Sequence, residues 1–575
     1  MRYNVILNFH LRTSMSLIRS KTLPYAVALL PIGLFFGMLY GFTPNIFWLD
    51  DIEAVLLLHN WDLSPDWQQR FQMVWFPNNE HRIVILKICV LLLSLFGGII
   101  NFKWLTILTY LYLIPLFYLF WKVIPAPNAR KIYYFLPIPF LFLNLQCSTA
   151  IFWFILTFQR NLVIGFGLIG IYYLVKGKRL GTLMGLISIL LACLSNSDGL
   201  LFVLIGSLVF LLKREWKGFG FYVLGSVIFM SLFFIKNPAS NLIAKGIKYF
   251  LAHPWESPQA FFILLGSVID FWEGDSYPFR LVITFWTGVV MFICILVGLW
   301  IGLKRYLIPF YKQPIVALDK PTRRAADIYL FLLLAFIYCL ANVAMLSILR
   351  TQNGLFSFLI GNHKIFSTLS ITLLYLLWLF LKPTKTYLYT SLFVAVIFWG
   401  ISIISYQPRV KAWYEQRVAG LYNLTHNHYG LGFGIKEDKQ YGLTAKVNDL
   451  ISKEAYFPPN YLTNLLDVRH STTQNEGLKF DITGQKEGTF HLTIDESPLL
   501  RHEYYGVLVS EKGVAHPTEG KYRVFSNYPH LAWFNEVAVS YQFQISNMPR
   551  GKYRFYLADA NAQQMWQSNY YLVID

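Results

Sequence analysis

Charged side chains are scarce in this chain of 575 residues, of which only 14% are Asp, Glu, Lys or Arg. A soluble globular protein carries about 25% charged residues. The rest of the chain is unusually apolar, with 55% hydrophobic residues and a mean hydropathy of +0.45. This composition excludes an ordinary soluble domain and indicates an integral membrane protein.

Acidic residues are the scarcer charged class, since 31 Asp and Glu stand against 49 Lys and Arg and give a net charge of +18. In a soluble protein such a basic excess would suit a nucleic-acid partner. Here Lys and Arg cluster in short loops between apolar runs, where the positive-inside rule accounts for them. We therefore expect contact with membrane lipid and no nucleic-acid partner.

Several motifs that carry chemistry are missing. The chain has no phosphate-cradling P-loop, no HExxH zinc motif and no GxSxG turn. No βαβ pattern for a nucleotide-sugar fold is present. The polar C-terminal region has no disulfide framework or zinc site, because all cysteines lie in or at the edge of apolar segments: Cys89, Cys147, Cys193, Cys294 and Cys339.

Long apolar runs predict a bundle of about eleven membrane crossings. The N-terminus has basic residues before the first run and no small-residue cleavage site, so we expect a retained span with a cytoplasmic N-terminus. The runs are roughly 23–43, 103–122, 132–148, 160–176, 181–196, 199–213, 217–236, 280–303, 326–349, 364–381 and 386–405.

One further apolar segment, 83–101, would reverse the side of the membrane on which every later basic loop lies if it were counted as a crossing. If it crossed the membrane fully, five basic loops, including those at Lys122 and Lys304, would face outward against the positive-inside rule. We interpret it as a re-entrant or juxtamembrane helix, which protein contacts permit. Residues 406–575 then lie on the outer face.

Beyond Tyr406 the apolar runs shorten and alternate, as in 490–494, 541–545 and 553–557, which is typical of strands with one buried face. Residues 443–466 have a helical pattern. The sequence thus predicts a transmembrane domain over 1–405, with a first outer loop over 44–101. An α+β domain on the outer face, mostly a β-sandwich, is predicted over 406–575.

The first outer loop is rich in acids and tryptophans and is too polar to cross a bilayer. Asp50 and Asp51 stand near the end of the first span. A carboxylate there could deprotonate a hydroxyl or amine acceptor as a general base. The same pair would also cap a helix beginning at Ile52, and the sequence leaves both interpretations open.

Other outer-face polar residues are candidates for binding a substrate phosphate. Arg82 could bind one with two hydrogen bonds and His81 could donate another. An interfacial belt of anchors is the alternative. The candidate substrate-binding residues are Glu80, His81, Arg82, Arg160, Asp198, Arg350, His363 and Lys364.

This arrangement resembles the GT-C superfamily of polytopic glycosyltransferases, on a cytoplasmic N-terminus, one span, an acidic outer loop with an Asp pair and a multispan core. It is most similar to the bacterial branch with aminoarabinose and other lipid-linked sugar transferases, including members with an NEHR sequence in the first loop, here residues 79–82. The resemblance implies that Asp50 or Asp51 is the catalytic base. It also implies a polyprenyl-phosphate sugar as donor, which needs no nucleotide site.

Two departures from that family matter. Residues 146–161 lack the second acidic residue that many relatives carry, so we favour a mechanism without metal and expect no cofactor. Asp198 stands where relatives often have lysine. We therefore expect an enzyme of a Gram-negative inner membrane that transfers sugar to a periplasmic glycan or lipid acceptor. The alternatives are a lipid-linked glycan ligase or polymerase, or a non-catalytic polyprenyl-lipid transporter or scaffold.

Overall fold

The structure is a computed structural model. It describes residues 22–77, 81–235, 241–272, 277–309, 320–467, 472–474, 480–486, 489–494, 504–524, 537–559 and 564–574.

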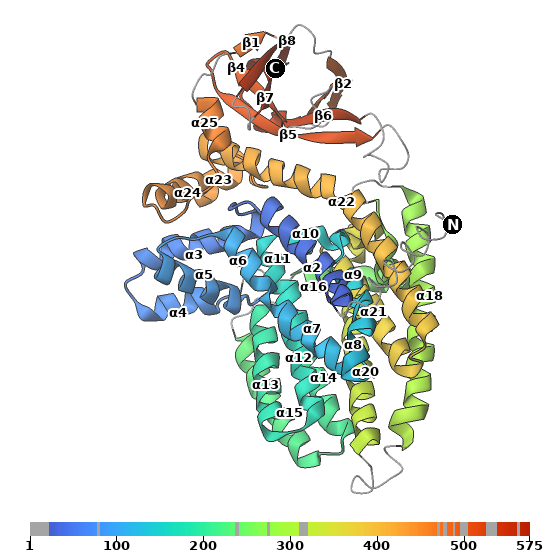
Figure 1. The fold of residues 1–575 in the computed structure, drawn as a ribbon. Coiled ribbons are helices and arrows are strands. Elements are labelled where there is room, and N and C mark those ends of the chain that lie inside the picture. Colours follow the sequence, from blue (N-terminus) through green and yellow to red (C-terminus); the bar gives the residue numbers. More distant parts are fainter. Residues whose placement is uncertain are drawn as a thin grey trace, which may run out of the picture.

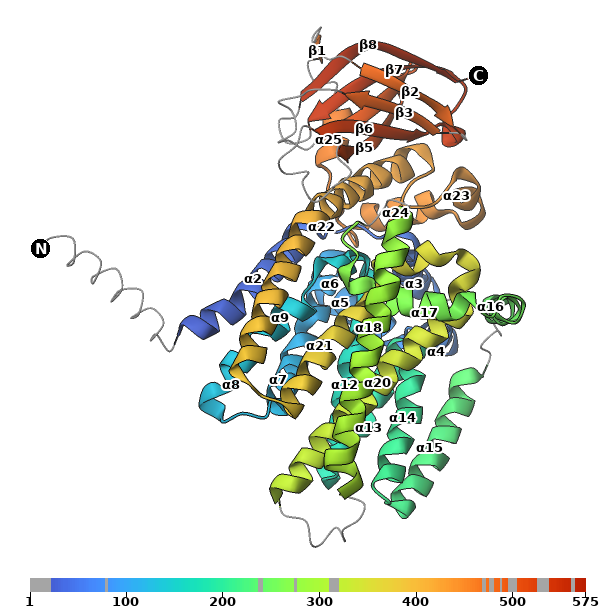
Figure 2. The same cartoon turned by 90° about the vertical axis from the view of Figure 1, so that its right-hand side faces the viewer.

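Nine helices or helical runs in this described part are long and apolar enough to cross a membrane. Figures 1 and 2 show them as one elongated bundle with a sheet at one end. The runs are α2 (Leu23–Phe42), α6 to α7 (Phe102–Val123), α8 to α10 (Asn128–Phe152), α11 to α12 (Phe154–Lys176), α15 (Trp216–Phe234), α18 with the π-turn after it (Pro278–Leu307), α20 with η9 (Pro321–Asn353), α21 (Lys364–Leu381) and α22 (Lys385–Asn427).

Three shorter apolar helices accompany them: α5 (Val84–Gly97), α13 (Arg179–Ser195) and α14 (Leu200–Leu212), the last preceded by the turn η5 (Ser197–Gly199). Two more helices, α16 (Asn241–Ala252) and α17 (Glu256–Leu265), lie between α15 and α18 in the chain. The prediction of a polytopic helical membrane protein is confirmed. Each predicted run overlaps a helix, two of them through the short α13 and α14. The number of crossings stays a prediction.

The first outer loop folds into α3 (Ile52–Leu63), α4 (Trp67–Trp75) and α5. Figure 1 shows these helices projecting together to one side of the bundle. Asp66 caps α4, since its carboxylate accepts a hydrogen bond from the Gln68 backbone N–H (3.1 Å). The segment predicted as the first outer loop is therefore a folded helical unit beside the bundle.

Helix α22 connects the bundle to the C-terminal region. It runs without a break through 405–406 and contains Pro408, and Figure 1 shows that it changes direction along its length. Proline removes an intrahelical hydrogen bond and kinks a helix. Three short helices follow α22, namely α23 (Ile435–Tyr441), α24 (Leu443–Ser452) and α25 (Tyr461–Asp467), and the last two agree with the predicted helical pattern over 443–466.

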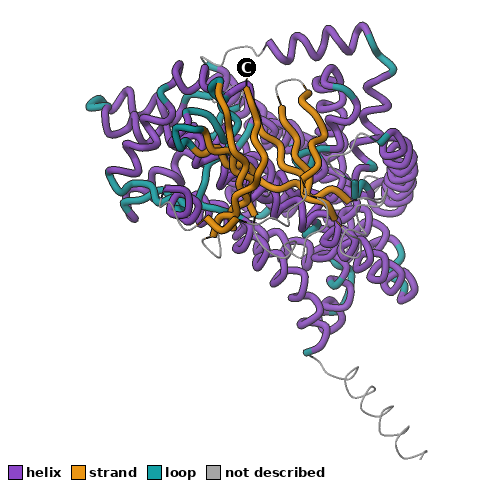
Figure 3. The backbone as a smooth tube through the Cα atoms, turned by 90° about the horizontal axis from the view of Figure 1, so that it is seen from above, coloured by secondary structure: helices purple, strands orange, loops and turns teal. Residues whose placement is uncertain are grey.

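The C-terminal region is an eight-stranded sheet with the order β1-β8-β7-β4-β5-β6-β3-β2. Its pairings are antiparallel except for the parallel pair β1–β8. Seen from above, the strands lie over the helical part (Figure 3). The strands are β1 (Thr472–Gln474), β2 (Phe480–Lys486), β3 (Thr489–Ile494), β4 (Tyr504–Ser510), β5 (Ala515–Val524), β6 (Val537–Gln544), β7 (Gly551–Asp559) and β8 (Gln564–Ile574).

The sheet curls over its own core. Phe555 on β7 contacts Tyr541 and Phe543 on β6, with ring centroids 5.8 and 6.2 Å apart. Two strands separate β6 from β7 in the sheet order, so these rings meet only because the sheet folds back. The region is mainly β, as predicted, and its strands form one curled sheet; a sandwich of two sheets stays a prediction.

Candidate functional site

The Asp pair occupies a tight turn directly after the first span. The backbone of Leu49 has a positive φ of 43°, which non-glycine residues seldom adopt. Asp51 holds this turn, because its Oδ2 accepts a hydrogen bond from the Trp48 backbone N–H (2.9 Å). The side chain of Asp51 is buried, and its neighbour Asp50 is exposed.

Asp51 also accepts a hydrogen bond from the start of a helix in another part of the chain. Helices α10 (Ser148–Phe152) and α11 (Phe154–Leu156) are separated by the extended residue Trp153. The break leaves backbone N–H groups at the start of α11 without intrahelical partners. The Oδ1 of Asp51 accepts a hydrogen bond from one of them, the Ile155 N–H (2.8 Å).

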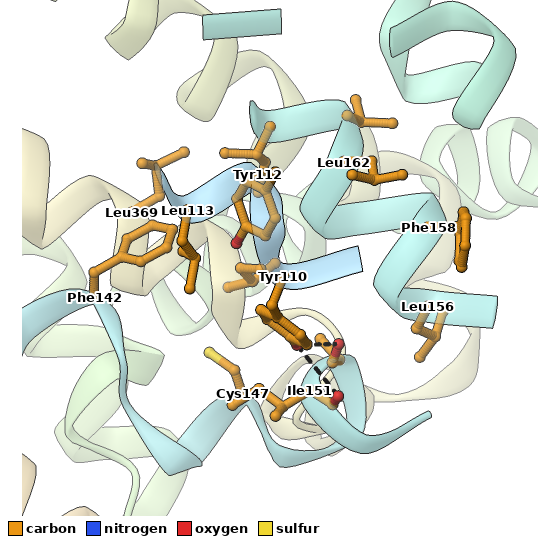
Figure 4. Packing of buried hydrophobic residues seen from close by; sticks show 14 of the residues in the cluster. Tyr110, Tyr112, Leu113, Phe142, Cys147, Ile151, Leu156, Phe158, Leu162 and Leu369 are labelled. Carbon is orange, nitrogen blue, oxygen red and sulfur yellow. Dashed lines mark hydrogen bonds between the residues drawn. The ribbon is translucent and has the colours of Figure 1, made fainter. Parts of the chain in front are cut away.

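The backbone carbonyls on the other side of the same break accept hydrogen bonds from other side chains. Asn161 donates to the Ala150 carbonyl (3.0 Å) and to the hydroxyl of Tyr110 (2.9 Å), which in turn donates to the Ile151 carbonyl (3.2 Å). Figure 4 shows Tyr110 pointing at these carbonyls from inside the core. Arg417 of α22 donates to the Phe152 carbonyl (3.1 Å). Irregular backbone inside a membrane protein requires such internal partners.

The buried position changes the acidity of Asp51. Burial raises its pKa to about 8, against the Ile155 and Trp48 hydrogen bonds and the positive charge of Arg417, which lower it. Both carboxylate oxygens are already engaged by backbone N–H groups. Asp51 is thus suited to hold the turn, whereas its neighbour Asp50 faces the surface.

A second polar site lies where several separate segments meet. Arg160 of the π-helix η4 (Thr157–Leu162) forms an ion pair with Asp198 of η5. The pKa of His81 and that of His363 are each lowered to about 3, first by burial and then by the positive charges of Arg160 and Arg350. We call these residues the Arg–His cluster: His81, Arg160, Asp198, Arg350 and His363.

The Arg–His cluster has hydrogen-bonding capacity left over. Among the described residues, neither the Nε of Arg160 nor the Nδ1 of His363 has a hydrogen-bond partner. Asn196, two residues before Asp198, is fully buried with both side-chain polar atoms likewise unpartnered within the described part. Buried polar atoms are normally satisfied by protein, water or ligand, so the cluster is suited to bind a polar group. Its two arginines outnumber the one carboxylate, Asp198, and this excess of positive charge favours an anion.

Arg82 requires a correction, because its guanidinium is already occupied. It is fully buried and donates to the carbonyls of Phe233 (2.6 Å), Ile235 (2.6 Å) and Trp75. Those carbonyls end the helices α15 and α4, where the last carbonyls lack intrahelical partners. Arg82 therefore joins two helix ends and is not available as the predicted phosphate ligand.

Lys364 is corrected in the same way. Its ammonium is fully buried and contacts the Asp270 carboxylate (2.8 Å) and the Tyr406 hydroxyl (2.6 Å). Arg280 binds the same carboxylate through two nitrogens, at 2.9 and 2.7 Å. Burial alone would raise the pKa of Asp270, but the charges of Lys364 and Arg280 hold it below the usual value. Lys364 belongs to this buried triad and not to an open phosphate site.

The structure thus brings His81, Arg160, Asp198, Arg350 and His363 together, places Asp50 and Asp51 in one turn, and uses Arg82 and Lys364 elsewhere. Glu80 lies outside the described residues. Within the described part, no group of three or more His, Cys, Asp or Glu side chains could hold a metal ion.

Sequence reasoning missed the structural role of Arg417 and of Asn161. Nothing in the sequence near Arg417 indicates its role, because the Phe152 carbonyl at the helix break, to which it donates, lies far away in the chain. The break itself has a weak signal, the lone Asn161 next to Arg160 in an apolar run.

Comparison with known proteins adds no assignment, since no family model, no curated protein and no solved structure is significantly similar to this chain.

Proposed function

We propose that this chain is a membrane glycosyltransferase that moves a sugar from a polyprenyl-phosphate donor to a glycan or lipid acceptor on the outer face. The observation that carries this proposal is the Arg–His cluster. It combines two arginines with buried polar atoms that lack protein partners in the described part. A lipid phosphate matches both its charge and its position beside the membrane-spanning runs.

In the proposed reaction the acceptor hydroxyl gives its proton to the Asp50 carboxylate. The acceptor oxygen forms a bond to the anomeric carbon of the sugar, and the bond from that carbon to the phosphate oxygen breaks. The electron pair leaves with the polyprenyl phosphate, which gains negative charge. Arg160 and Arg350 stabilise that charge, and fixed cations near a developing charge lower the barrier.

The two neutral histidines suit this role. With pKa values near 3, His81 and His363 stay uncharged at physiological pH and can each donate one ring N–H to a phosphate oxygen. Asp198 restrains Arg160 by the ion pair between them. Asp51 acts as a positioning residue, because it fixes the turn that presents Asp50.

The proposed location is the inner membrane of a Gram-negative bacterium, with the C-terminal domain in the periplasm. Support comes from the chain's multi-pass character and from the basic loops discussed above. The donor and acceptor are then both lipid-accessible molecules of the cell envelope.

Binding of the donor phosphate can be tested with a matched pair of lipids. Purified full-length protein should bind undecaprenyl phosphate more tightly than undecaprenol, which lacks the phosphate. Arg160→Gln should weaken binding of undecaprenyl phosphate about 10- to 100-fold, the worth of a hydrogen bond to a charged group, and leave undecaprenol unaffected. Arg179→Gln, at an exposed arginine outside the cluster, is the control. Equal affinity for the two lipids would overturn the phosphate site.

Catalysis is tested at the Asp pair. Asp50→Asn should reduce transfer from an undecaprenyl-phosphate sugar by about 100-fold or more, because general-base catalysis contributes roughly 10²–10⁴. Binding of undecaprenyl phosphate should stay unchanged. Normal transfer by Asp50→Asn would remove the assignment of the base.

A non-catalytic polyprenyl-lipid transporter or scaffold is the second candidate. The observation in its favour is the broken helix between α10 and α11, since transporters build their sites from discontinuous helices. This candidate predicts lipid-phosphate binding without Asp50-dependent transfer.

A further inference from the structure

A cavity of about 330 Å³ lies between helix α22 and the C-terminal sheet, apart from the Arg–His cluster. Small-molecule sites span about 300–1,000 Å³, so this one has room for a small ring or two. Its walls come from α22, the loop at 429–434, and strands β5 and β6, with Trp48 of the first outer loop at one side.

The polar lining of this cavity is dominated by side-chain amides. Five amide residues line it together with one carboxylate, Glu519, and no Lys, Arg or His is among the lining residues. An amide both donates and accepts hydrogen bonds, which matches a hydroxyl group that does the same. A lining without cations disfavours phosphate and other anions. The amides are Gln416, Asn423, Gln542, Gln544 and Asn547.

Four aromatic residues also line the cavity: Trp48, Tyr429, Phe433 and Phe543. The face of an aromatic ring is electron-rich and attracts the weakly positive C–H groups of a neighbouring molecule. A pyranose ring presents C–H groups on its faces and hydroxyls around its edge. Amides with aromatic rings therefore fit a neutral sugar better than an apolar ligand or an ion.

Two of the amide side chains that line the cavity differ in their hydrogen bonding. The amide of Asn423 donates to the Pro517 carbonyl (2.8 Å) and accepts from Asn427 (2.9 Å), so it joins α22 to β5. Gln416, about two turns earlier on α22, is half-buried and makes no side-chain hydrogen bond to any described residue. Gln416 is thus positioned to bind a ligand hydroxyl in a wall that Asn423 holds in place.

The cavity adjoins the turn that carries the Asp pair. Gly432 has a positive φ of 90°, and a Cβ there would clash with the Leu49 side chain. The Leu49 backbone N–H donates to the Leu431 carbonyl (3.2 Å). Because glycine allows this close approach, the loop at 429–434 packs directly on the turn at Trp48, and the cavity lies beside the turn that carries Asp50.

We propose that this cavity binds a neutral sugar ring. Its identification as part of the acceptor rests on the proposed glycosyltransferase function, because the cavity lies beside the proposed base. Sugar binding itself rests only on the lining. The ring would be held by Gln416 and Gln544 at its hydroxyls and by Trp48 or Phe433 at a C–H face.

The test uses the full chain in detergent micelles on an array of immobilised neutral oligosaccharides of glucose, galactose, mannose, rhamnose and N-acetylhexosamines. We expect at least one of them to bind. Gln416→Leu and Gln544→Leu should each reduce that signal at least tenfold, whereas Gln440→Leu, at an exposed glutamine outside the cavity, should not. Gln544 is exposed and its amide oxygen accepts an exposed hydrogen bond from Asn547 (3.2 Å), so we expect its substitution to leave the fold intact.

The sugar site and the transferase activity are tested by separate readouts, glycan binding and sugar transfer. If no oligosaccharide shows binding that depends on Gln416 or Gln544, or if only peptides or acidic glycans bind there, the sugar site is overturned, whatever the transfer assay gives. If Asp50→Asn abolishes transfer but keeps full glycan binding, both proposals stand. If glycan binding is present and no Asp50-dependent transfer exists, the cavity is a sugar site on a protein that is not a transferase.

Discussion

The Oδ1 of Asp51 accepts a hydrogen bond from the backbone N–H of Ile155, 104 residues later in the chain (2.8 Å). This contact joins the first outer loop to the start of a helix in the bundle. Both carboxyl oxygens of Asp51 accept hydrogen bonds from backbone N–H groups, so Asp51 is the proposed positioning residue. Asp50, the exposed member of the pair, is therefore the proposed base.

The first prediction concerns the pH dependence of stability through Asp51. Its pKa is about 8 when folded, against an ordinary value of 3.8. Between these values the folded protein holds a proton that the unfolded chain has released, so stability falls as pH rises from about 4 to 8. This contribution is about 1.4 kcal/mol per pH unit. In Asp51→Asn it should be absent.

The measurement is the melting temperature of the wild type and of Asp51→Asn in detergent from pH 5 to pH 8. The Asp51→Asn variant loses one acceptor and should be the less stable protein at pH 5, with the difference narrowing as pH rises. A difference that stays constant over this range would show that Asp51 does not hold a raised pKa. Asp50→Asn serves as the control and should show no such trend.

The second prediction tests whether Arg82 stabilises two helix ends instead of binding phosphate. Arg82→Ala leaves carbonyls at the ends of α4 and α15 without their buried donor. Each unsatisfied buried group costs about 1–3 kcal/mol, so the melting temperature should drop clearly. Affinity of the folded protein for undecaprenyl phosphate should change less than about twofold, since the Arg82 guanidinium is hydrogen-bonded to backbone carbonyls. A tenfold loss of affinity with normal stability would restore the phosphate role.

The third prediction concerns the buried triad of Asp270, Arg280 and Lys364. Asp270→Asn leaves two buried cations without their shared anion, and breaking a buried pair costs about 3–5 kcal/mol. Lys364→Met should cost less, because Asp270 and Arg280 remain paired. Melting temperatures should therefore rank wild type above Lys364→Met and Lys364→Met above Asp270→Asn. Lys453→Met removes a solvent-exposed ion pair and should leave the melting temperature unchanged.

The fold class could be predicted from the sequence because apolar length and strand alternation are local signals. The run at 541–545 predicted a strand with one buried face, and Tyr541 and Phe543 are buried in the sheet core. The ends of helices were harder to predict from the sequence. The domain boundary predicted at 405–406 falls inside α22, since nothing local ends a helix that continues to Asn427.

The candidate site could be predicted only in part. His81, Arg160 and His363 were predicted to be outer-face polar residues, and the structure places them within electrostatic reach of one another. Their partners depend on how distant segments pack. The sequence alone therefore could not tell that Arg82, next to His81, caps helix ends, or that Lys364, next to His363, is locked to Asp270.

The last prediction tests the topology through α5. This helix has 14 residues and spans about 21 Å at 1.5 Å per residue, against a hydrocarbon core of about 30 Å. If α5 does not cross, Lys304 faces the cytoplasm and Lys436 faces outward; if it crosses, the two are exchanged. Both residues are exposed, so single cysteines at these positions, in a background without the five native cysteines, can be labelled in intact cells with a membrane-impermeant maleimide. We expect Lys436→Cys to react and Lys304→Cys to react only after the membrane is opened. The reverse pattern would make α5 a full crossing and would put the C-terminal domain, with its proposed sugar site, in the cytoplasm.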